Sequence, residues 1–341
     1  MIVGFDVKSY LRDRGIEFLE KGKNIMREHV GIRCVVCDDK SKHLNIKVDG
    51  THALCFRCKV HVFGIKKVLE LLEGRRMNTE NAFKIAVRYF SNEIERSFKS
   101  RDNVNVFEDN LSRKKKLYEF FYTECNELRD NSVYVKYLEK RGISFDFAKW
   151  FGIREGRKDE WRWYVVVPVR DEKGELVSFV GRLACNSKSG VRYKNASRDM
   201  SMGYRGLFGI WECKELGLLE KGYLFVVEGV FDVLKLLQEG VPAVGLMTKN
   251  VSDEQLVQMV RYVSADKNIV IGLDADVDVK ECYDLKNRFL MWFDSVVVLG
   301  FGGREGDVVF DSDKKDFGDM DKDEIKKLKK FIEKMLKKGV K

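Results

Sequence analysis

The sequence predicts a multi-domain α+β protein, with a four-cysteine zinc ribbon near the N-terminus and a mixed α/β core that contains a Rossmann-like parallel sheet. Three observations lead to this fold class. The chain has 341 residues, enough for two or three domains of roughly 100–200 residues each. Two CxxC pairs lie near its N-terminus. In the second half, apolar strand-like runs alternate with helical patterns, as they do in βαβ units.

Composition excludes several classes of protein. Hydrophobic residues make up 44% of the chain, which is enough to bury cores and excludes wholesale disorder. No apolar run reaches the roughly 18 residues of a membrane span, and charged residues come too early for a signal peptide. We therefore expect a cytoplasmic protein with no membrane partner. The net charge of +9 is a weak bias toward polyanionic partners.

Polarity and periodicity suggest where the domains end. A helix is expected over 63–72, after the cysteines. The tract SNEIERSFKSRDNVNVFEDNLSRKKK has few large apolar residues and no steady period, which predicts a linker. We expect five parts: a zinc-ribbon domain at 1–90, the linker at 91–116, the first part of the core at 117–215, its parallel-sheet domain at 216–320 and a basic C-terminal helix at 321–341.

Four of the eight cysteines predict a structural zinc site: Cys34, Cys37, Cys55 and Cys58. Two residues between paired thiolates let one tight turn direct both sulfurs to one ion, and two such turns complete a tetrahedron. The spacer HLNIKVDGTHALCF alternates around a DG turn, as a hairpin does. His43, His52 and His61 are alternative ligands that four cysteines make unnecessary. Basic and aromatic neighbours suit either nucleic-acid contact or a solvated surface: Arg33, Lys42, Lys47, Phe56, Arg57 and Lys59.

Strand and helix patterns alternate through the core. Strands are expected at 163–170 and 176–182, on either side of a DEKG turn. Further along, the expected order is strand 223–227, helix 231–239, strand 243–246, helix 253–263, strand 268–273, helix 281–292 and strand 296–299. This alternation predicts a parallel sheet.

Acidic residues follow the expected strands of that sheet. Glu228 comes after the first strand, and Asp274 and Asp276 come after the third, in GLDAD. Because ligands bind beyond the carboxyl ends of parallel strands, these carboxylates are expected to converge. Together they would suit Mg²⁺ and phosphoryl transfer, although an isolated DxD is commonly a solvated loop. A third acidic position is left open among Asp316, Asp319 and Asp307.

At this point the sequence resembles a known family. VVEGVFDVLKL, followed by GLDAD, is similar to the toprim domain of DnaG-type bacterial and phage primases, type IA and II topoisomerases and some nucleases. Three other segments resemble the primases in particular: the four-cysteine ribbon, YLEKRGISFDFAKWFGI, and VVVPVRDEKGELVSFVGRL with the KYLN-like motif that follows. The match covers most of residues 1–320 in the family's order, so the core is expected to be a primase core with a toprim domain.

The resemblance implies roles for individual residues. Glu228 would be an acid/base or metal-linked residue, and Asp274 and Asp276 would hold catalytic Mg²⁺ or Mn²⁺, with Asp316 as a further ligand. Substrate or nucleic-acid contacts would come from Arg182, Arg192, Asn195 and Lys249. This chain departs from the family's pattern at Met247, which replaces a glycine, at Arg192 and Lys194, which replace a lysine and a leucine, and in a zinc set without histidine.

The implied activity is Mg²⁺-dependent synthesis of short RNA primers from ribonucleoside triphosphates on single-stranded DNA during replication. The chain has no G-x-x-x-x-G-K-[ST] phosphate loop, so a separate replicative helicase is the expected partner. The basic C-terminal helix is either a docking or DNA-contacting element or a solvated end. Two alternatives stay open: a toprim nuclease or topoisomerase-like strand-cleaving enzyme, and a non-catalytic zinc-ribbon DNA-binding replication protein.

Overall fold

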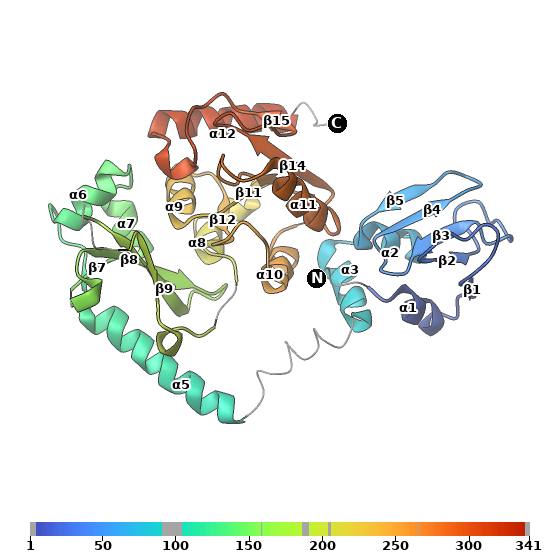
Figure 1. Ribbon diagram of the computed structural model, residues 1–341, viewed down its shortest axis with the longest axis horizontal. Coiled ribbons are helices and arrows are strands. Elements are labelled where there is room, and N and C mark those ends of the chain that lie inside the picture. Colours follow the sequence, from blue (N-terminus) through green and yellow to red (C-terminus); the bar gives the residue numbers. More distant parts are fainter. Residues whose placement is uncertain are drawn as a thin grey trace. The chain divides into compact units, whose positions relative to one another are not determined.

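The computed structural model describes residues 5–90, 104–157, 159–185, 191–203, 206–264 and 266–337 (Figure 1). Within it the chain forms two compact units. One comprises Met1–Arg101, Leu256–Asn268 and Tyr283–Val296, and the other comprises Asp102–Gln255, Ile269–Cys282 and Val297–Lys341. No described helix combines the length and the apolar character that crossing a membrane requires.

The N-terminal sheet is antiparallel, and its five strands follow one another in sequence order. The strands are β1 (Phe18–Leu19), β2 (His29–Ile32), β3 (Leu44–Lys47), β4 (His52–Cys55) and β5 (His61–Phe63). The predicted hairpin around the DG turn is confirmed, since β3 pairs with β4. Three helices flank the sheet: α1 (Val7–Asp13), α2 (Ile65–Glu73), which is the helix expected at 63–72, and α3 (Thr79–Ala86) with a 3₁₀ turn at Val87–Tyr89.

A second antiparallel sheet forms the first part of the core, in the order β10-β9-β8-β7-β6. Its long hairpin of β8 and β9 is the pair of strands predicted around the DEKG turn, with Tyr164 opposite Leu183 and a bulge at Val169/Arg170. The bounds are β6 (Cys125–Glu127), β7 (Arg154–Gly156), β8 (Tyr164–Arg170), β9 (Leu176–Leu183) and β10 (Tyr193–Asn195). Helices α6 (Val133–Lys140) and α7 (Phe145–Phe151) and 3₁₀ turns at Asp159–Trp161 and Arg198–Met200 complete this part.

Helix α5 (Val104–Glu119) corrects the predicted linker. Residues 91–103 lie outside the described part of the chain, but 104–116 are helical, and the sequence analysis predicted no helix there. The helix continues into a π-helical turn at Phe120–Glu124. Leu117, near the C-terminal end of the helix, and Phe120 and Phe121 of the π-helical turn enter the core of the second sheet. Ion pairs of Lys114 with Glu175 (2.7 Å) and of Lys116 with Asp199 (3.4 Å) fix its polar part.

The third sheet has the order β12-β11-β13-β14-β15. The β11–β12 pair is parallel, as predicted, and β14 also pairs in parallel with β15, a strand that was not predicted. All five residues of β11 are buried, which is typical of a strand covered on both faces. The strands are β11 (Tyr223–Val227), β12 (Ala243–Gly245), β13 (Asn268–Ile271), β14 (Ser295–Gly300) and β15 (Val308–Val309). The helices are α8 (Ile210–Glu215), α9 (Val230–Gln238), α10 (Asp253–Tyr262) and α11 (Val279–Leu290), with 3₁₀ turns at Leu218–Glu220 and Phe317–Asp319.

The C-terminal helix α12 (Lys322–Lys337) is packed against the core. Ile325, Leu328 and Ile332 are fully buried, and the ring of Phe331 lies 5.6 Å from that of Phe310. Its apolar side is therefore covered by the chain itself.

Candidate active site and metal centre

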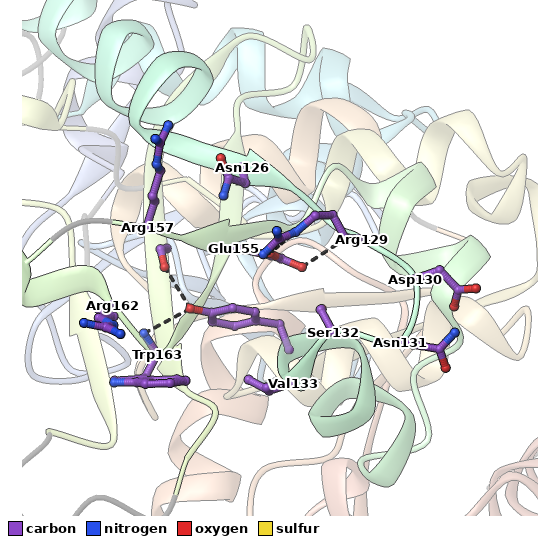
Figure 2. Close-up of a pocket in the computed structure, with 12 residues that line it drawn as sticks. Asn126, Arg129, Asp130, Asn131, Ser132, Val133, Glu155, Arg157, Arg162 and Trp163 are labelled. Atoms are coloured by element: carbon purple, nitrogen blue, oxygen red, sulfur yellow. Dashed lines mark hydrogen bonds and ion pairs between the residues drawn. The ribbon is translucent and has the colours of Figure 1, made fainter.

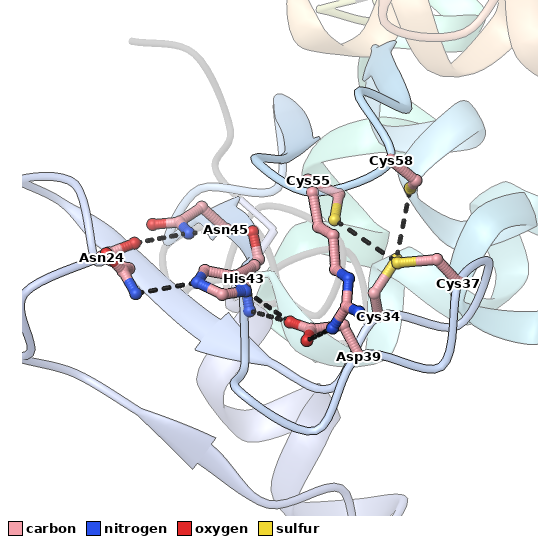
Figure 3. Close-up of polar contacts among 9 residues, drawn as sticks. Asn24, Cys34, Cys37, Asp39, His43, Asn45, Cys55 and Cys58 are labelled. Atoms are coloured by element: carbon pink, nitrogen blue, oxygen red, sulfur yellow. Dashed lines mark hydrogen bonds and ion pairs between the residues drawn. The ribbon is translucent and has the colours of Figure 1, made fainter.

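The four predicted zinc ligands meet at one end of the N-terminal sheet (Figure 3). Their sulfurs all lie within 4.8 Å of one another, with 3.8 Å between Cys34 and Cys58 and 3.9 Å between Cys37 and Cys55. Tetrahedral Zn–S bonds of about 2.3 Å require sulfurs about 3.8 Å apart. The cysteines are the one group of three or more potential ligands close enough to share an ion among the described residues. The predicted four-cysteine site is confirmed.

A buried carboxylate supports this site. Asp39 is 2% exposed and accepts hydrogen bonds from Arg57 (2.6 Å) and from Nδ1 of His43 (2.5 Å) (Figure 3). Burial, the largest single effect, opposes its charge, but these two hydrogen bonds together with those from the backbone N–H groups of Ser41 and His43 lower the pKa of Asp39 to about 2. His43 thus orients the cysteine turn through Asp39. Nε2 of His52 faces Nε2 of His29 at 2.9 Å, away from the sulfur cluster.

Glu228 and Asp274 converge at the carboxyl edge of the third sheet. Glu228 directly follows β11, and the backbone N–H of Asp274, three residues beyond β13, donates to its Oε1 at 3.2 Å. The chain leaves β11 for β12 on one side and returns to β13 on the other, so the two carboxylates flank a topological switch point, where open α/β sheets bind ligands. Asp276 lies exposed in the turn that follows Asp274.

Two further carboxyl groups join this edge. Asp232, in the first turn of α9, accepts hydrogen bonds from the backbone N–H of Gly229 (2.9 Å) and of Gly318 (2.7 Å). A Cβ on Gly318 would lie 3.2 Å from Oδ1 of Asp316 and 3.3 Å from Oδ1 of Asp232, so a glycine lets both carboxylates approach. Oδ1 of Asp316 is buried and has no hydrogen-bond partner among the described residues.

The structure separates the three competing acids. Asp316 neighbours Asp232, whereas Asp319 pairs with Arg141 at 3.2 Å and Asp307 accepts from the N–H of Val298 at 2.7 Å. Asp232 was missed by the sequence analysis. Its position one helical turn after Glu228 was the available signal.

Crowding and burial raise the pKa of these carboxyl groups. Burial, followed by the charges of Asp232, Glu228 and Asp316, raises the pKa of Asp274 to about 8. Burial and the charge of Asp316 raise the pKa of Asp232 to about 7. The pKa values of Glu228 and Asp316 are raised as well, chiefly by burial. Carboxylates arranged in this way favour a bound cation, which would replace the protons that otherwise neutralise them.

A buried arginine holds the Asp274 loop. Arg304, 8% exposed, donates to the carbonyl oxygens of Asp274 (2.7 Å) and Leu299 (2.8 Å). Its charge also lowers the pKa of Glu228, against the larger effect of burial. It lies in the FGGREGD loop, which has no periodic pattern from which its role could be predicted.

The predicted basic residues occupy different surroundings. Arg182 is 6% exposed, donates to the hydroxyl of Tyr137 at 2.9 Å and lies 4.4 Å from the ring centroid of Tyr193. The charge of Arg192 acts on Asp316. Lys249 is bound to Glu281 at 2.6 Å. Asn195 ends β10 and lines a separate cavity.

A pocket with three arginines lies at the N-terminus of α6 (Figure 2). Its volume is about 490 Å³, and Arg129, Arg157, Arg162 and Trp163 contribute to its wall. Trp163 has a φ of 74° and is 40% exposed, and the guanidinium of Arg162 lies 5.1 Å from its ring centroid. Tyr134 accepts from the N–H of Trp163 (3.2 Å) and donates to Gly156 (2.9 Å). The sequence analysis did not single out this pocket, although the segment GRKDEWRW combines basic and aromatic residues.

Comparisons with known proteins place this geometry in context. No protein-family model matches the chain. The DNA primase of Aquifex aeolicus is 34% identical over 116 residues, covering 33% of this chain and 22% of the relative. The DNA primase of Synechococcus elongatus is 24% identical over 296 residues, covering 73% of this chain and 41% of the relative. The chain thus spans less than half the length of these curated relatives.

A solved structure matches nearly the whole chain. The crystal structure of the zinc-binding and RNA polymerase domains of the Aquifex aeolicus primase superposes with a TM-score of 0.51 at 19% identity, covering 96% of this chain and 83% of that one. The likeness shows a common fold. The sequence matches to primases in several bacteria agree with it. The chain is therefore similar in sequence to bacterial DNA primases, and it shares the fold of the zinc-binding and RNA polymerase domains of the Aquifex aeolicus primase.

Proposed function

We propose that this chain is a primase, a DNA-directed RNA polymerase that synthesises short RNA primers on single-stranded DNA during replication. The observation that carries the proposal is the pair Glu228 and Asp274 at the switch point of the third sheet, joined by a 3.2 Å hydrogen bond. A polymerase of this kind needs acidic residues where the triphosphate of the incoming nucleotide meets the primer end.

The residues at the sheet edge fit a divalent cation. Glu228, Asp274 and Asp276 would hold Mg²⁺ or Mn²⁺. Asp316, whose buried Oδ1 has no hydrogen-bond partner within the described part of the chain, would be a further ligand beside Asp232. When bound, the ion supplies charge neutralisation at the reacting phosphate. Arg304 fixes the backbone of Asp274 through its carbonyl oxygen. Arg182, Arg192 and Lys249 would supply positive charge to the phosphates of ribonucleoside triphosphates or template.

The template partner would be single-stranded DNA. The zinc ribbon supplies a rigid domain with basic and aromatic surface residues, and the pocket of Figure 2 combines arginines with an exposed tryptophan. This combination suits phosphate contact with base stacking. A separate replicative helicase would expose the strand, and the protein would act in the cytoplasm.

We expect the double substitution Arg157→Ala/Arg162→Ala to weaken binding of a labelled single-stranded oligonucleotide by about tenfold at low salt, because two phosphate contacts are lost while Trp163 remains. Fluorescence anisotropy over a salt series measures this, and the slope of affinity against salt should become shallower. Lys173→Ala, in the exposed β8–β9 turn, is the control. If the affinity of the double variant and its dependence on salt are unchanged, this pocket does not bind the single-stranded template.

Glu228→Gln tests the assignment of the catalytic edge. Glutamine keeps the volume of the side chain and the oxygen that accepts the N–H of Asp274, but it carries no charge. We therefore expect a folded protein whose Mg²⁺-dependent ribonucleotide incorporation is at least about 100-fold slower. The same reactions without nucleotides test the alternatives. Mg²⁺-dependent cleavage of the single strand would favour the strand-cleaving enzyme, and template binding without incorporation or cleavage would favour the non-catalytic replication protein.

A further inference from the structure

An uncharged pocket lies beside Glu228. It has a volume of about 360 Å³, within the range of small-molecule sites, and is formed between β9, β10 and the loop that follows β12. The segment before α8 closes one side, because Phe208 pairs with Gly245 of β12 through two backbone hydrogen bonds of 2.9 and 3.0 Å. Charged residues are 34% of the chain, yet among the residues that the structure describes none lines this pocket.

The lining combines an apolar floor with polar groups at the rim. Phe179 and Phe208 are buried beneath it. At the rim, the side chains of Ser178 and Asn195 make no hydrogen bond within the described residues, although their backbones belong to β9 and β10. A site of this kind does not suit a phosphate, which needs positive charge. It suits a flat, uncharged ring with hydrogen-bonding groups at its edge.

Met247 connects this pocket to the acidic edge. Its N–H donates to the carbonyl oxygen of Glu228 at 2.9 Å, and its side chain is 37% exposed at the pocket rim. Its φ is 62°, a left-handed conformation that favours glycine and that long side chains seldom adopt. Such strain concentrates at functional sites, and a thioether packs well on the edge and face of aromatic rings.

We propose that this pocket binds the base of the nucleotide substrate, with Met247 packed against the ring and Ser178 and Asn195 bonded to its edge. The inference rests on the proposed primase function and adds the subsite that holds the nucleoside. The phosphates of the same nucleotide would extend past Met247 toward Glu228. Base contacts made here raise the affinity for the nucleotide, since none of these groups reaches the reacting phosphate.

The test uses steady-state incorporation by the full chain on homopolymer templates, with each ribonucleotide varied in turn. Met247→Gly removes the side chain and suits the positive φ, so the variant should fold. Ser178→Leu fills the pocket. We expect both to raise KM for the nucleotide about tenfold, with kcat changed less than about twofold. Val309→Ala, at an exposed position of β15, is the control.

Competition separates a base site from a phosphate site. Adenosine, which carries no phosphate, should compete with ATP in the wild type and at least about tenfold more weakly in Met247→Gly, whereas inorganic triphosphate should compete equally with both. Unchanged KM and adenosine inhibition in both variants would overturn the inference. So would a raised KM for template DNA with the nucleotide KM unchanged, because the pocket would then hold a template base. If the wild type incorporates no nucleotide at all, the proposed primase function itself fails. That result differs from the outcomes above, in which the wild type is active and only the role of the pocket is refuted.

Discussion

Asp274→Asn should abolish primer synthesis and at the same time stabilise the metal-free protein. Burial and three neighbouring carboxyl groups raise the pKa of Asp274 to about 8. The contribution of the protonated Asp274 carboxyl to the free energy of unfolding is therefore fully present below about pH 4. It is lost as the pH rises toward 8 and the carboxyl ionises. Asparagine cannot ionise, so the variant avoids this loss. We expect the free energy of unfolding of the variant to exceed that of the wild type by about 1–2 kcal/mol at pH 7.5 in EDTA. The difference is no larger because solvent screens part of the repulsion between the carboxylates.

Thermal unfolding between pH 4 and 8 in EDTA measures this gain. The melting temperatures should coincide near pH 4 and diverge by roughly 2–6 °C toward pH 8. Mg²⁺ should raise Tm of the wild type and leave the variant nearly unchanged. Asp284→Asn, an exposed carboxylate of α11, is the matched control. A variant that incorporates nucleotides at a near-normal rate, or that is less stable across the whole pH range, would contradict the placement of Asp274 in the metal site.

Cys55→Ser should unfold the N-terminal sheet. The Cys55 side chain is fully buried at the end of β4, and a structural zinc site with four cysteine ligands contributes its binding free energy, on the order of 10 kcal/mol, to folding. The small core around Val30, Leu44 and Ile46 cannot replace that contribution. We expect less than one zinc per chain and rapid amide exchange throughout β2–β5, with the core of the second unit still protected.

Cys185→Ser, a half-buried cysteine outside the cluster, is the control and should keep both zinc and protection. Zinc content by elemental analysis and hydrogen exchange by mass spectrometry give the two readouts. Stoichiometric zinc in Cys55→Ser, or strands that stay protected after complete chelation, would show that the ribbon folds without the metal.

The sequence predicts the sheet-edge acids because their strands are unambiguous. The β11 run is apolar throughout and ends directly before Glu228, and β13 is apolar up to the Asp274 loop. In a parallel arrangement this alone brings both carboxylates to one edge. The zinc ligands are predictable for a similar reason, since the spacing within each CxxC pair restricts the geometry locally.

The rest depends on contacts between distant segments. Asp232 sits within a helical pattern and gains its role from Gly318, which returns to it at 2.7 Å. The position of Asp316 beside Asp232, while Asp319 and Asp307 have other partners, follows from the path of an irregular loop, which periodicity does not describe. Helix α5 was missed because charged and polar residues dominate this tract. Its C-terminal end is held by Leu117 in the core of the second sheet, a contact between distant segments that the sequence pattern does not reveal.

The most direct test of the proposed function is incorporation of radiolabelled ribonucleotides by the purified chain on random single-stranded DNA, with Mg²⁺ or Mn²⁺. The account predicts short labelled RNA products that require both template and divalent cation and that Asp274→Asn does not make. Absence of incorporation with either cation on every template, while the template stays bound, would contradict the assignment of this chain as a primase.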